Sequence, residues 1–241
     1  MKIETLKAVQ AARTARRPIV LVKRIADGAE AIVTPEGAQG ALAGDPAAMA
    51  AGRAALESGR SETVEAAGGK LFVHAFIPPQ RLIVVGAVHI AQALVPMAAM
   101  TGFDVVVVDP RRAFAADHRF PNVTVLGDWP DEAMERLAPD SSTAVVTLTH
   151  DPKLDDPALE VALRSSAFYV GSLGSRRTHE KRKARLLEAG ITEAQFARIR
   201  GPVGLNIGAK SPAEIAISIV AEIVQTRAAL REPAPAKDRA A

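Results

Sequence analysis

The turn Gly86-Ala87-Val88-His89 has the composition of an anion-binding loop. It lies between the apolar run Arg81–Val85 and a helical pattern that begins at Ile90. In such a strand–turn–helix unit the first N–H groups of the helix lack intrahelical partners, and together with the helix dipole they favour negative charge. The spacing therefore predicts a phosphate or a nucleotide-like ligand here, and the alternative is a bare turn without a ligand.

The same turn matches the dinucleotide-binding (Rossmann) fingerprint only in part. Gly86 can form the tight first turn, but Val88 stands where the fingerprint has its second glycine. A β-branched side chain there takes up space that a pyrophosphate needs. Asp109, after the next apolar run, could accept ribose hydroxyls, whereas Arg111 and Arg112 could hold a phosphate. NAD(P) is therefore the less favoured ligand.

Polar side chains also follow the apolar run Thr143–Thr147. His150 and Asp151 bring an imidazole and a carboxylate together, which would suit acid–base chemistry with Asp151 orienting His150. Alternatively, Asp151 caps a helix, the role that we expect of Asp156 ahead of a helix over Pro157–Ser165. Both interpretations of Asp151 remain open.

Two further glycine-containing loops carry candidate ligand-binding groups. The loop over residues 171–177 opens a basic helix, and its small residues, hydroxyls and cations suit an anion. Farther along that helix, Lys183 and Arg185 are expected to face solvent. The loop over residues 201–211 resembles a P-loop but lacks adjacent Gly and Lys, which excludes ATP hydrolysis by this loop. The candidate residues of both loops are Gly171, Ser172, Ser175, Arg176, Gly204, Gly208 and Lys210.

The elements that must position these loops alternate between short apolar runs and helical patterns. Runs that are apolar throughout are typical of a parallel sheet covered by helices, so we expect an α/β fold with a Rossmann-like, mostly parallel sheet and helices on both faces. Ligands bind such sheets beyond the carboxyl ends of the strands, where all four loops should converge. The expected strands are Arg81–Val85, Asp104–Val108, Val123–Leu126, Thr143–Thr147 and Phe168–Val170.

The chain is expected to contain two domains and a tail. Residues 1–80 predict a small N-terminal α+β domain, with a hinge at Pro78-Pro79. Residues 81–230 form the Rossmann-like domain, whose last helix begins at a capping box over Ser211–Glu214. The apolar stripe of this helix could serve domain packing or a homodimer. Residues 231–241 (REPAPAKDRAA) cannot bury a core and are expected to be disordered.

Composition excludes several classes of function. The 241 residues are 48% hydrophobic and 24% charged and include no cysteine, which excludes disulfides, thiolate metal sites and cysteine nucleophiles within them. A net charge of +3 and an aromatic content of 4% argue against nucleic-acid binding. The 5 histidines are too scattered to indicate a metal site. With no apolar run of membrane-spanning length and no signal core after Met1, we expect a cytoplasmic protein that binds no membrane.

An ordered series of segments resembles a known protein family. The segments are similar to the xanthine dehydrogenase accessory factor (XdhC/CoxI) family, and they are RLIVVGAVHIAQAL, VVVVDPRRAFA, RFPN, VVTLTHDPKLDDPAL, FYVGSLGSRRTHEKR and RIRGPVGLNIGAKSPAEIAISIVAEIV. The resemblance implies a maturation factor, rather than an enzyme, that binds the molybdenum cofactor. It also implies support of cofactor sulfuration and insertion into a molybdenum hydroxylase of the xanthine or carbon monoxide dehydrogenase type.

The sequence matches the family's loops at some positions and departs from the family's pattern at others. The positions that match the family's loops are Gly86, His89, Asp109, His150, Asp151, Gly171, Ser175, Arg176, Gly204, Gly208 and Lys210. Val88 replaces a family glycine, and residues 1–80 lack the family's Gly-Gly-Cys segment and Gly-Ser-x-Pro loop. We therefore expect a specialised paralogue that works beside a cysteine sulfurtransferase or a cysteine-bearing paralogue. The alternatives are an NAD(P)-dependent oxidoreductase and an interaction scaffold with an empty crevice.

Overall fold

The computed structural model describes residues 2–111 and 119–231, and the chain divides into two compact units, Met1–Pro78 and Pro79–Ala241. Arg231 is the last residue of a helix. Arg112 and residues 232–241, which include all but the first residue of the expected disordered tail, lie outside the described residues.

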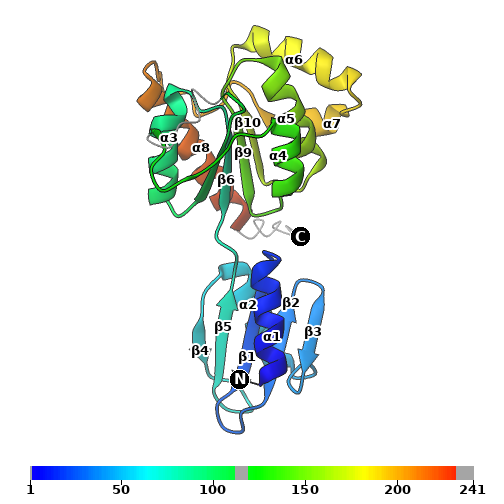
Figure 1. Ribbon diagram of the computed structural model, residues 1–241. Helices are drawn as coiled ribbons and strands as arrows, with labels where there is room; N and C mark the ends of the chain where they lie inside the picture. The colour runs from blue at the N-terminus through cyan, green and yellow to red at the C-terminus, as the bar shows by residue number, and fades with distance from the viewer. Residues whose placement is uncertain (1, 112–118, 232–241) are drawn as a thin grey trace, which may run out of the picture. The chain divides into compact units, whose positions relative to one another are not determined.

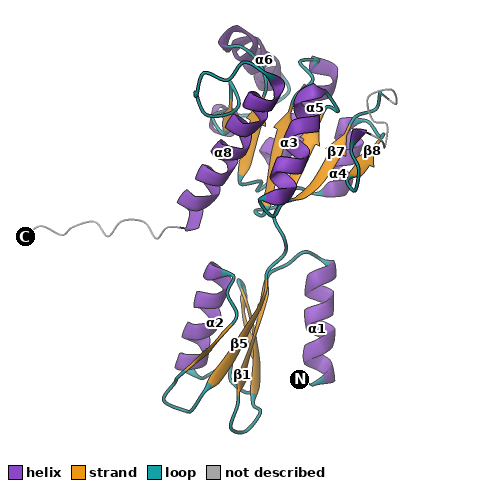
Figure 2. Ribbon diagram, turned by 90° about the vertical axis from the view of Figure 1, so that its left-hand side faces the viewer, coloured by secondary structure: helices purple, strands orange, loops and turns teal. Residues whose placement is uncertain are grey.

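The first unit is an antiparallel sheet with a helix on either side (Figure 2). Val9 of α1 (Ile3–Thr14) packs with Ile19, and Ala48 of α2 (Pro46–Ser58) packs with Val20 on the other side. The strands lie in the order β3-β2-β1-β5-β4 and are β1 (Ile19–Arg24), β2 (Glu30–Thr34), β3 (Gly37–Gly40), β4 (Glu62–Val64) and β5 (Leu71–Phe76).

The second unit contains a six-stranded parallel sheet in the order β11-β10-β9-β6-β7-β8. The chain builds outward from β6 in one direction and from β9 in the other, so the strand order reverses between these two neighbours, as in dinucleotide-binding folds. The expected α/β fold class is therefore confirmed. The strands are β6 (Arg81–Val85), β7 (Asp104–Val108), β8 (Thr124–Leu126), β9 (Thr143–Thr147), β10 (Tyr169–Ser172) and β11 (Ile199–Arg200).

Helices cover both faces of this sheet because alternate strand residues are apolar on both sides (Figure 1). Leu82 and Val84 pack under α3 (His89–Met100) and α8 (Pro212–Arg231), whereas Ile83 and Val85 face the opposite layer. That layer consists of α4 (Pro130–Leu137), α5 (Pro152–Arg164), α6 (Arg176–Glu188) and α7 (Glu193–Phe196).

Two helix starts test the sequence predictions directly. The capping box of α8 is confirmed, because the Glu214 carboxylate accepts from the Ser211 N–H at 2.8 Å and Ser211 Oγ accepts in return. The start of α5 was predicted wrongly. This helix begins at Pro152, and Asp156 lies inside it rather than at its cap. The cause is a repeated Asp-Pro pair, of which the first pair, directly after the strand, begins the helix.

Candidate functional site at the carboxyl edge of the parallel sheet

The loops singled out in the second unit follow strands that all end at one edge of the sheet. Thr147 of β9 and Ser172 of β10 are buried neighbours whose hydroxyl oxygens lie 2.5 Å apart. Gly86, with φ of 109°, approaches the next loop so closely that an added methyl group would lie 2.6 Å from Thr149 Cγ2. The ends of β6, β9 and β10 therefore form one continuous surface.

A fully satisfied ion pair fastens the end of β7 to the Gly86 turn. Asp109 is 0% exposed, and its Oδ2 accepts from the Ala87 N–H at 2.8 Å and from Arg111 Nη2 at 2.7 Å. Its Oδ1 accepts from Arg111 Nε and the Arg111 N–H. Burial acts to raise the pKa of Asp109, but these hydrogen bonds outweigh it and hold the pKa below its usual value. Asp109 thus serves the fold, with each oxygen occupied by the chain's own donors.

The first turn of α3 has no side-chain cap. Val88 occupies the cap position, where it provides no acceptor, and it is half-buried against the core beneath α3. The next residue, His89, is exposed. Backbone N–H groups at the start of this helix are therefore open to solvent or to an anion.

The loop after β9 is held by a buried carboxylate inside α5. Asp155 is 1% exposed and accepts from Thr149 Oγ1 at 2.7 Å and from the His150 N–H at 3.1 Å. His150 is exposed and has a φ of 62°, a left-handed conformation that costs a non-glycine residue about 1–3 kcal/mol and that occurs often at functional sites. Asp155 therefore holds an exposed imidazole in a strained position.

Asp151 caps α5 rather than orienting His150. Its Oδ1 accepts from the Lys153 N–H at 3.0 Å. Among the described residues, no hydrogen bond joins its carboxylate to the His150 ring. The structure therefore supports the interpretation of Asp151 as a helix cap.

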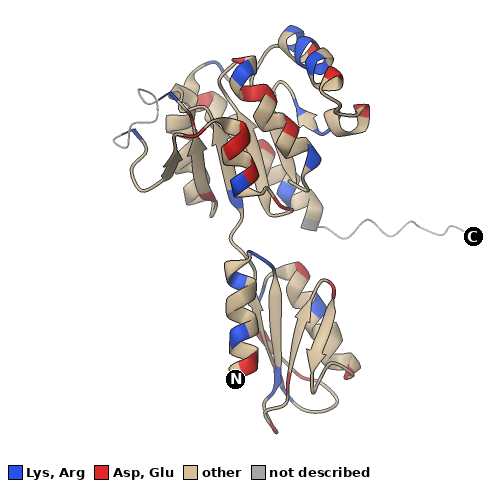
Figure 3. Cartoon of the chain, turned by 45° about the vertical axis from the view of Figure 1, so that its right-hand side comes forward, with Lys and Arg blue, Asp and Glu red and all other residues tan. Residues whose placement is uncertain are grey.

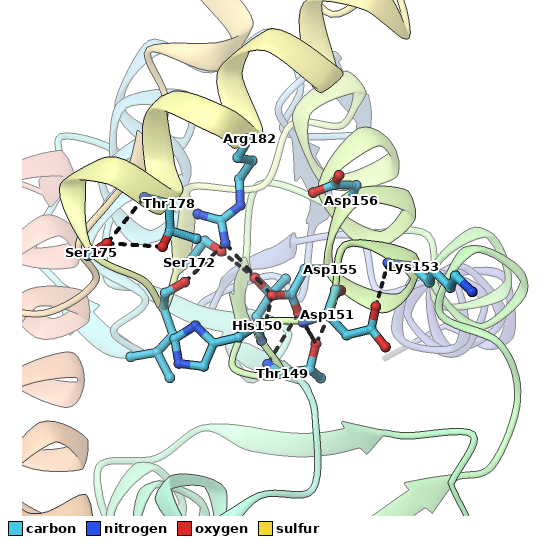
Figure 4. A network of polar contacts seen from close by, with 12 residues as sticks. Thr149, His150, Asp151, Lys153, Asp155, Asp156, Ser172, Ser175, Thr178 and Arg182 are labelled. Atoms are coloured by element: carbon cyan, nitrogen blue, oxygen red, sulfur yellow. Dashed lines mark hydrogen bonds and ion pairs between the residues drawn. The ribbon is translucent and has the colours of Figure 1, made fainter.

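A buried cation from α6 faces the same carboxylate (Figure 4). Arg182 is 2% exposed, and its Nη2 donates to the Leu173 carbonyl at 3.0 Å and lies 3.8 Å from Asp155 Oδ2. Its Nε and Nη1 are buried without a hydrogen-bond partner. Burial lowers the pKa of Arg182 and raises the pKa of Asp155, because each charge has lost its water. This site therefore contains unsatisfied positive donors.

The remaining cations of α6, which Figure 3 shows in blue, were described less accurately from sequence. Lys183 and Arg185 were expected simply to face solvent. Instead, Lys183 Nζ lies 2.8 Å from Glu193, and Arg185 donates to both oxygens of Asp156, at 2.5 and 3.1 Å. These two side chains tie α6 to α7 and α5.

Sequence reasoning missed Asp155 and Arg182, although helical spacing carried the signal. Arg182 lies four residues before Leu186, and Asp155 lies four residues before Leu159; both leucines are fully buried. Residues four apart share one face of a helix. This spacing places both charges on the buried faces of α5 and α6.

The glycines of the other two loops divide into packed and open positions. A methyl group added at Gly171 would lie 2.6 Å from Val203 Cγ2, and the Gly204 N–H donates to Glu222 of α8 at 2.9 Å. Gly208 and Lys210 are exposed, with no atom within 4 Å of a methyl group added at Gly208. Ser175 caps α6 by accepting from the Thr178 N–H, and Arg176 is exposed in the first turn.

Two negative findings hold for the described ranges 2–111 and 119–231. These residues contain no group of three or more His, Cys, Asp or Glu that could hold a metal ion. They also contain no helix that combines the length and apolar character needed to cross a membrane.

Comparison with known proteins identifies the family of the second unit. A family profile described as the XdhC Rossmann domain matches residues 82–223, more than half of the chain. The chain belongs to the XdhC family. The XdhC match runs from β6 into α8 and so contains every loop of the carboxyl edge.

Three relatives align with about the same share of this XdhC family member. They are the uncharacterised Escherichia coli protein YqeB (36% identical over 159 residues, 64% of this chain and 28% of YqeB), a protein of Bacillus subtilis named as a probable xanthine dehydrogenase subunit (35% over 158, 65% and 46%) and the E. coli molybdenum cofactor insertion chaperone PaoD (33% over 152, 63% and 42%). The alignments span less than half the length of each relative.

A solved structure resembles both units. The crystal structure of a xanthine dehydrogenase from Bacillus halodurans has a TM-score of 0.66 and 27% identity, covering 97% of this chain and 66% of that one. The likeness to this structure therefore extends beyond the XdhC Rossmann domain to the N-terminal antiparallel unit.

Proposed function

We propose that this chain binds the molybdenum cofactor and supports its insertion into a molybdenum hydroxylase of the xanthine or carbon monoxide dehydrogenase type. The observation that carries the proposal is membership of the XdhC family, in which one relative is named a molybdenum cofactor insertion chaperone. The B. subtilis relative is named for xanthine dehydrogenase itself. The proposed compartment is the cytoplasm, where the client enzyme would be assembled.

The donors at the carboxyl edge fit the anionic and hydrogen-bonding groups of the cofactor. The uncapped first turn of α3 offers N–H groups, and His89 and His150 offer exposed imidazoles. Arg182 offers two buried donors that lack a partner. When bound, the cofactor supplies the molybdenum centre that a hydroxylase requires. The chain's own residues would hold and orient it and shield it from water.

Three observations favour this ligand over a dinucleotide. The Asp109 oxygens, which would accept ribose hydroxyls, are already filled by Ala87 and Arg111. Val88 stands at the position of the second fingerprint glycine. Asp151 caps a helix, so the described residues lack the pair in which Asp151 orients His150 for the acid–base chemistry of an oxidoreductase.

Sulfuration requires a partner, because the 241 residues contain no cysteine. A persulfide forms on a thiol, so sulfur for the cofactor would have to come from a cysteine sulfurtransferase or from a cysteine-bearing paralogue bound to the same client. The role proposed for this chain is to carry and protect the cofactor during that exchange.

The test is retention of the cofactor by the full chain. Cofactor released anaerobically from a molybdenum hydroxylase is mixed with the chain, and the protein fraction from gel filtration is assayed for molybdenum and for pterin fluorescence. We expect about one molybdenum per chain and no saturable binding of NAD or NADP in parallel titrations. Saturable NAD binding without retained molybdenum would overturn the proposal.

A further inference from the structure

A small pocket lies between α5 and α6 beside the loop that follows β9. Its volume is about 200 Å³. We call it the Arg182 pocket, and its lining includes His150, Asp155, Arg177, Thr178, Lys181 and Arg182. Sites for drug-sized ligands measure about 300–1,000 Å³, so this pocket suits one small group of a larger molecule.

The acidic side chains of the pocket are already occupied. Asp156 receives two hydrogen bonds from Arg185, and Asp155 accepts from Thr149 and from the His150 N–H. By contrast, the side chains of Arg177 and Lys181, both in α6, make no hydrogen bond or ion pair with any described residue. The pocket therefore has a surplus of positive charge that the chain itself does not neutralise.

Arg182 adds buried donors to this surplus. A buried charge is costly unless it is paired and hydrogen-bonded, yet Nε and Nη1 have no partner and the nearest carboxylate oxygen, on Asp155, is 3.8 Å from Nη2. A planar guanidinium can donate two parallel hydrogen bonds to an oxyanion. A tetrahedral oxyanion seated against this guanidinium would satisfy donors that have no partner among the described residues.

We propose that the Arg182 pocket binds a phosphate monoester group, with Arg182 as the buried donor and Arg177 and Lys181 at the rim. A dianion matches the surplus charge, and the pocket's size admits the phosphate while the rest of the ligand lies outside, toward exposed His150. The assignment of this phosphate to the molybdenum cofactor rests on the proposed function. The anion site itself does not.

The experiment titrates the full chain with methyl phosphate by isothermal calorimetry at low ionic strength. Arg182→Lys keeps the charge but loses the planar guanidinium that can donate two parallel hydrogen bonds. Lys181→Ala removes a charge at the rim of the pocket. As the matched control, Lys7→Ala removes an exposed, unpaired charge from α1. We expect saturable 1:1 binding, weakened about tenfold or more by Arg182→Lys, as for loss of a charge-assisted hydrogen bond. Lys181→Ala should weaken it less, and Lys7→Ala should leave it unchanged.

Two outcomes would overturn the inference: no saturable binding by the wild-type chain, or equal affinity in all three variants. If circular dichroism shows that Arg182→Lys does not fold, binding by Lys181→Ala and Arg177→Ala tests the inference instead, because the side chains of Lys181 and Arg177 are exposed.

Cofactor retention by the same variants separates this inference from the proposed function. Methyl phosphate binding that depends on Arg182, without cofactor retention, would support the pocket and contradict the function. Cofactor retention that is equal in the wild type, Arg182→Lys and Lys181→Ala would support the function and overturn the pocket.

Discussion

Two aspartate–arginine pairs lie at the same sheet edge, and they differ in how fully their charged groups are hydrogen-bonded. At the end of β7, the Arg111 guanidinium donates two hydrogen bonds to Asp109, and both carboxylate oxygens are filled. Between α5 and α6, Asp155 and Arg182 are 3.8 Å apart, and two guanidinium nitrogens are left without partners. The first pair stabilises a turn. The second pair keeps positive charge available, which is the property that a binding site needs.

The largest effect should come from breaking the satisfied pair. Asp109→Ala removes the carboxylate that accepts from the Ala87 N–H and from Arg111, and we expect the free energy of unfolding to fall by about 3 kcal/mol. Urea denaturation followed by circular dichroism measures the change. A loss below about 1 kcal/mol would mean that the pair contributes little to the fold.

The contact between the Gly86 turn and the Thr149 loop should rank second. Gly86→Ala places a methyl group 2.6 Å from Thr149 Cγ2 at a φ of 109°, and we expect a loss of about 2 kcal/mol in unfolding free energy. Gly102→Ala is the matched control, because φ there is 89° but no atom lies within 4 Å of the added methyl group. Equal losses in the two variants would show that only backbone conformation matters.

Removing the unsatisfied cation should change stability least. Arg182→Met loses the hydrogen bond to Leu173 and the attraction to Asp155, but it also removes two buried donors that lack partners. The Asp155 carboxylate left behind keeps its hydrogen bonds from Thr149 and the His150 N–H, and burial already raises its pKa, which favours the neutral form. We therefore expect these terms to offset one another within about 1 kcal/mol by urea denaturation. A loss as large as that of Asp109→Ala would contradict the distinction between the two pairs.

The two carboxylates should also respond to pH with opposite signs. The folded-state pKa of Asp109 is lowered, so its contribution to stability is present above the ordinary value of about 3.9 and is lost as pH falls toward the folded-state pKa. The folded-state pKa of Asp155 is raised by burial, so stability decreases as pH rises from about 3.9 through the folded-state pKa.

Asparagine variants isolate these two dependences. Urea denaturation between about pH 3 and pH 7 should show a weaker acid loss in Asp109→Asn than in the wild type. Asp155→Asn should lack the decrease that accompanies rising pH. Changes of the same sign in both variants would refute the opposite pKa shifts.

The sequence predicts the strands of the parallel sheet well, but it predicts poorly which charged groups have hydrogen-bond partners. Strongly apolar runs identified β6, β7 and β9 and the loops at their ends, because local pattern determines those elements. The two-residue strand β11 and the glycine-rich edge strand β3 carry no such pattern, since tertiary pairing defines them. Arg182 is one cation in a basic helix, and only its burial against α5 distinguishes it from its neighbours.

Displacement by a small phosphate ester tests whether the phosphate of the molybdenum cofactor occupies the Arg182 pocket. The chain is loaded with cofactor, titrated with methyl phosphate, and separated by gel filtration, with protein-bound molybdenum as the readout. We expect methyl phosphate to release the molybdenum and equimolar methyl sulfate, a monoanion, to release much less. Molybdenum that stays bound at saturating methyl phosphate, or that never binds at all, would show that the cofactor's phosphate does not occupy the pocket.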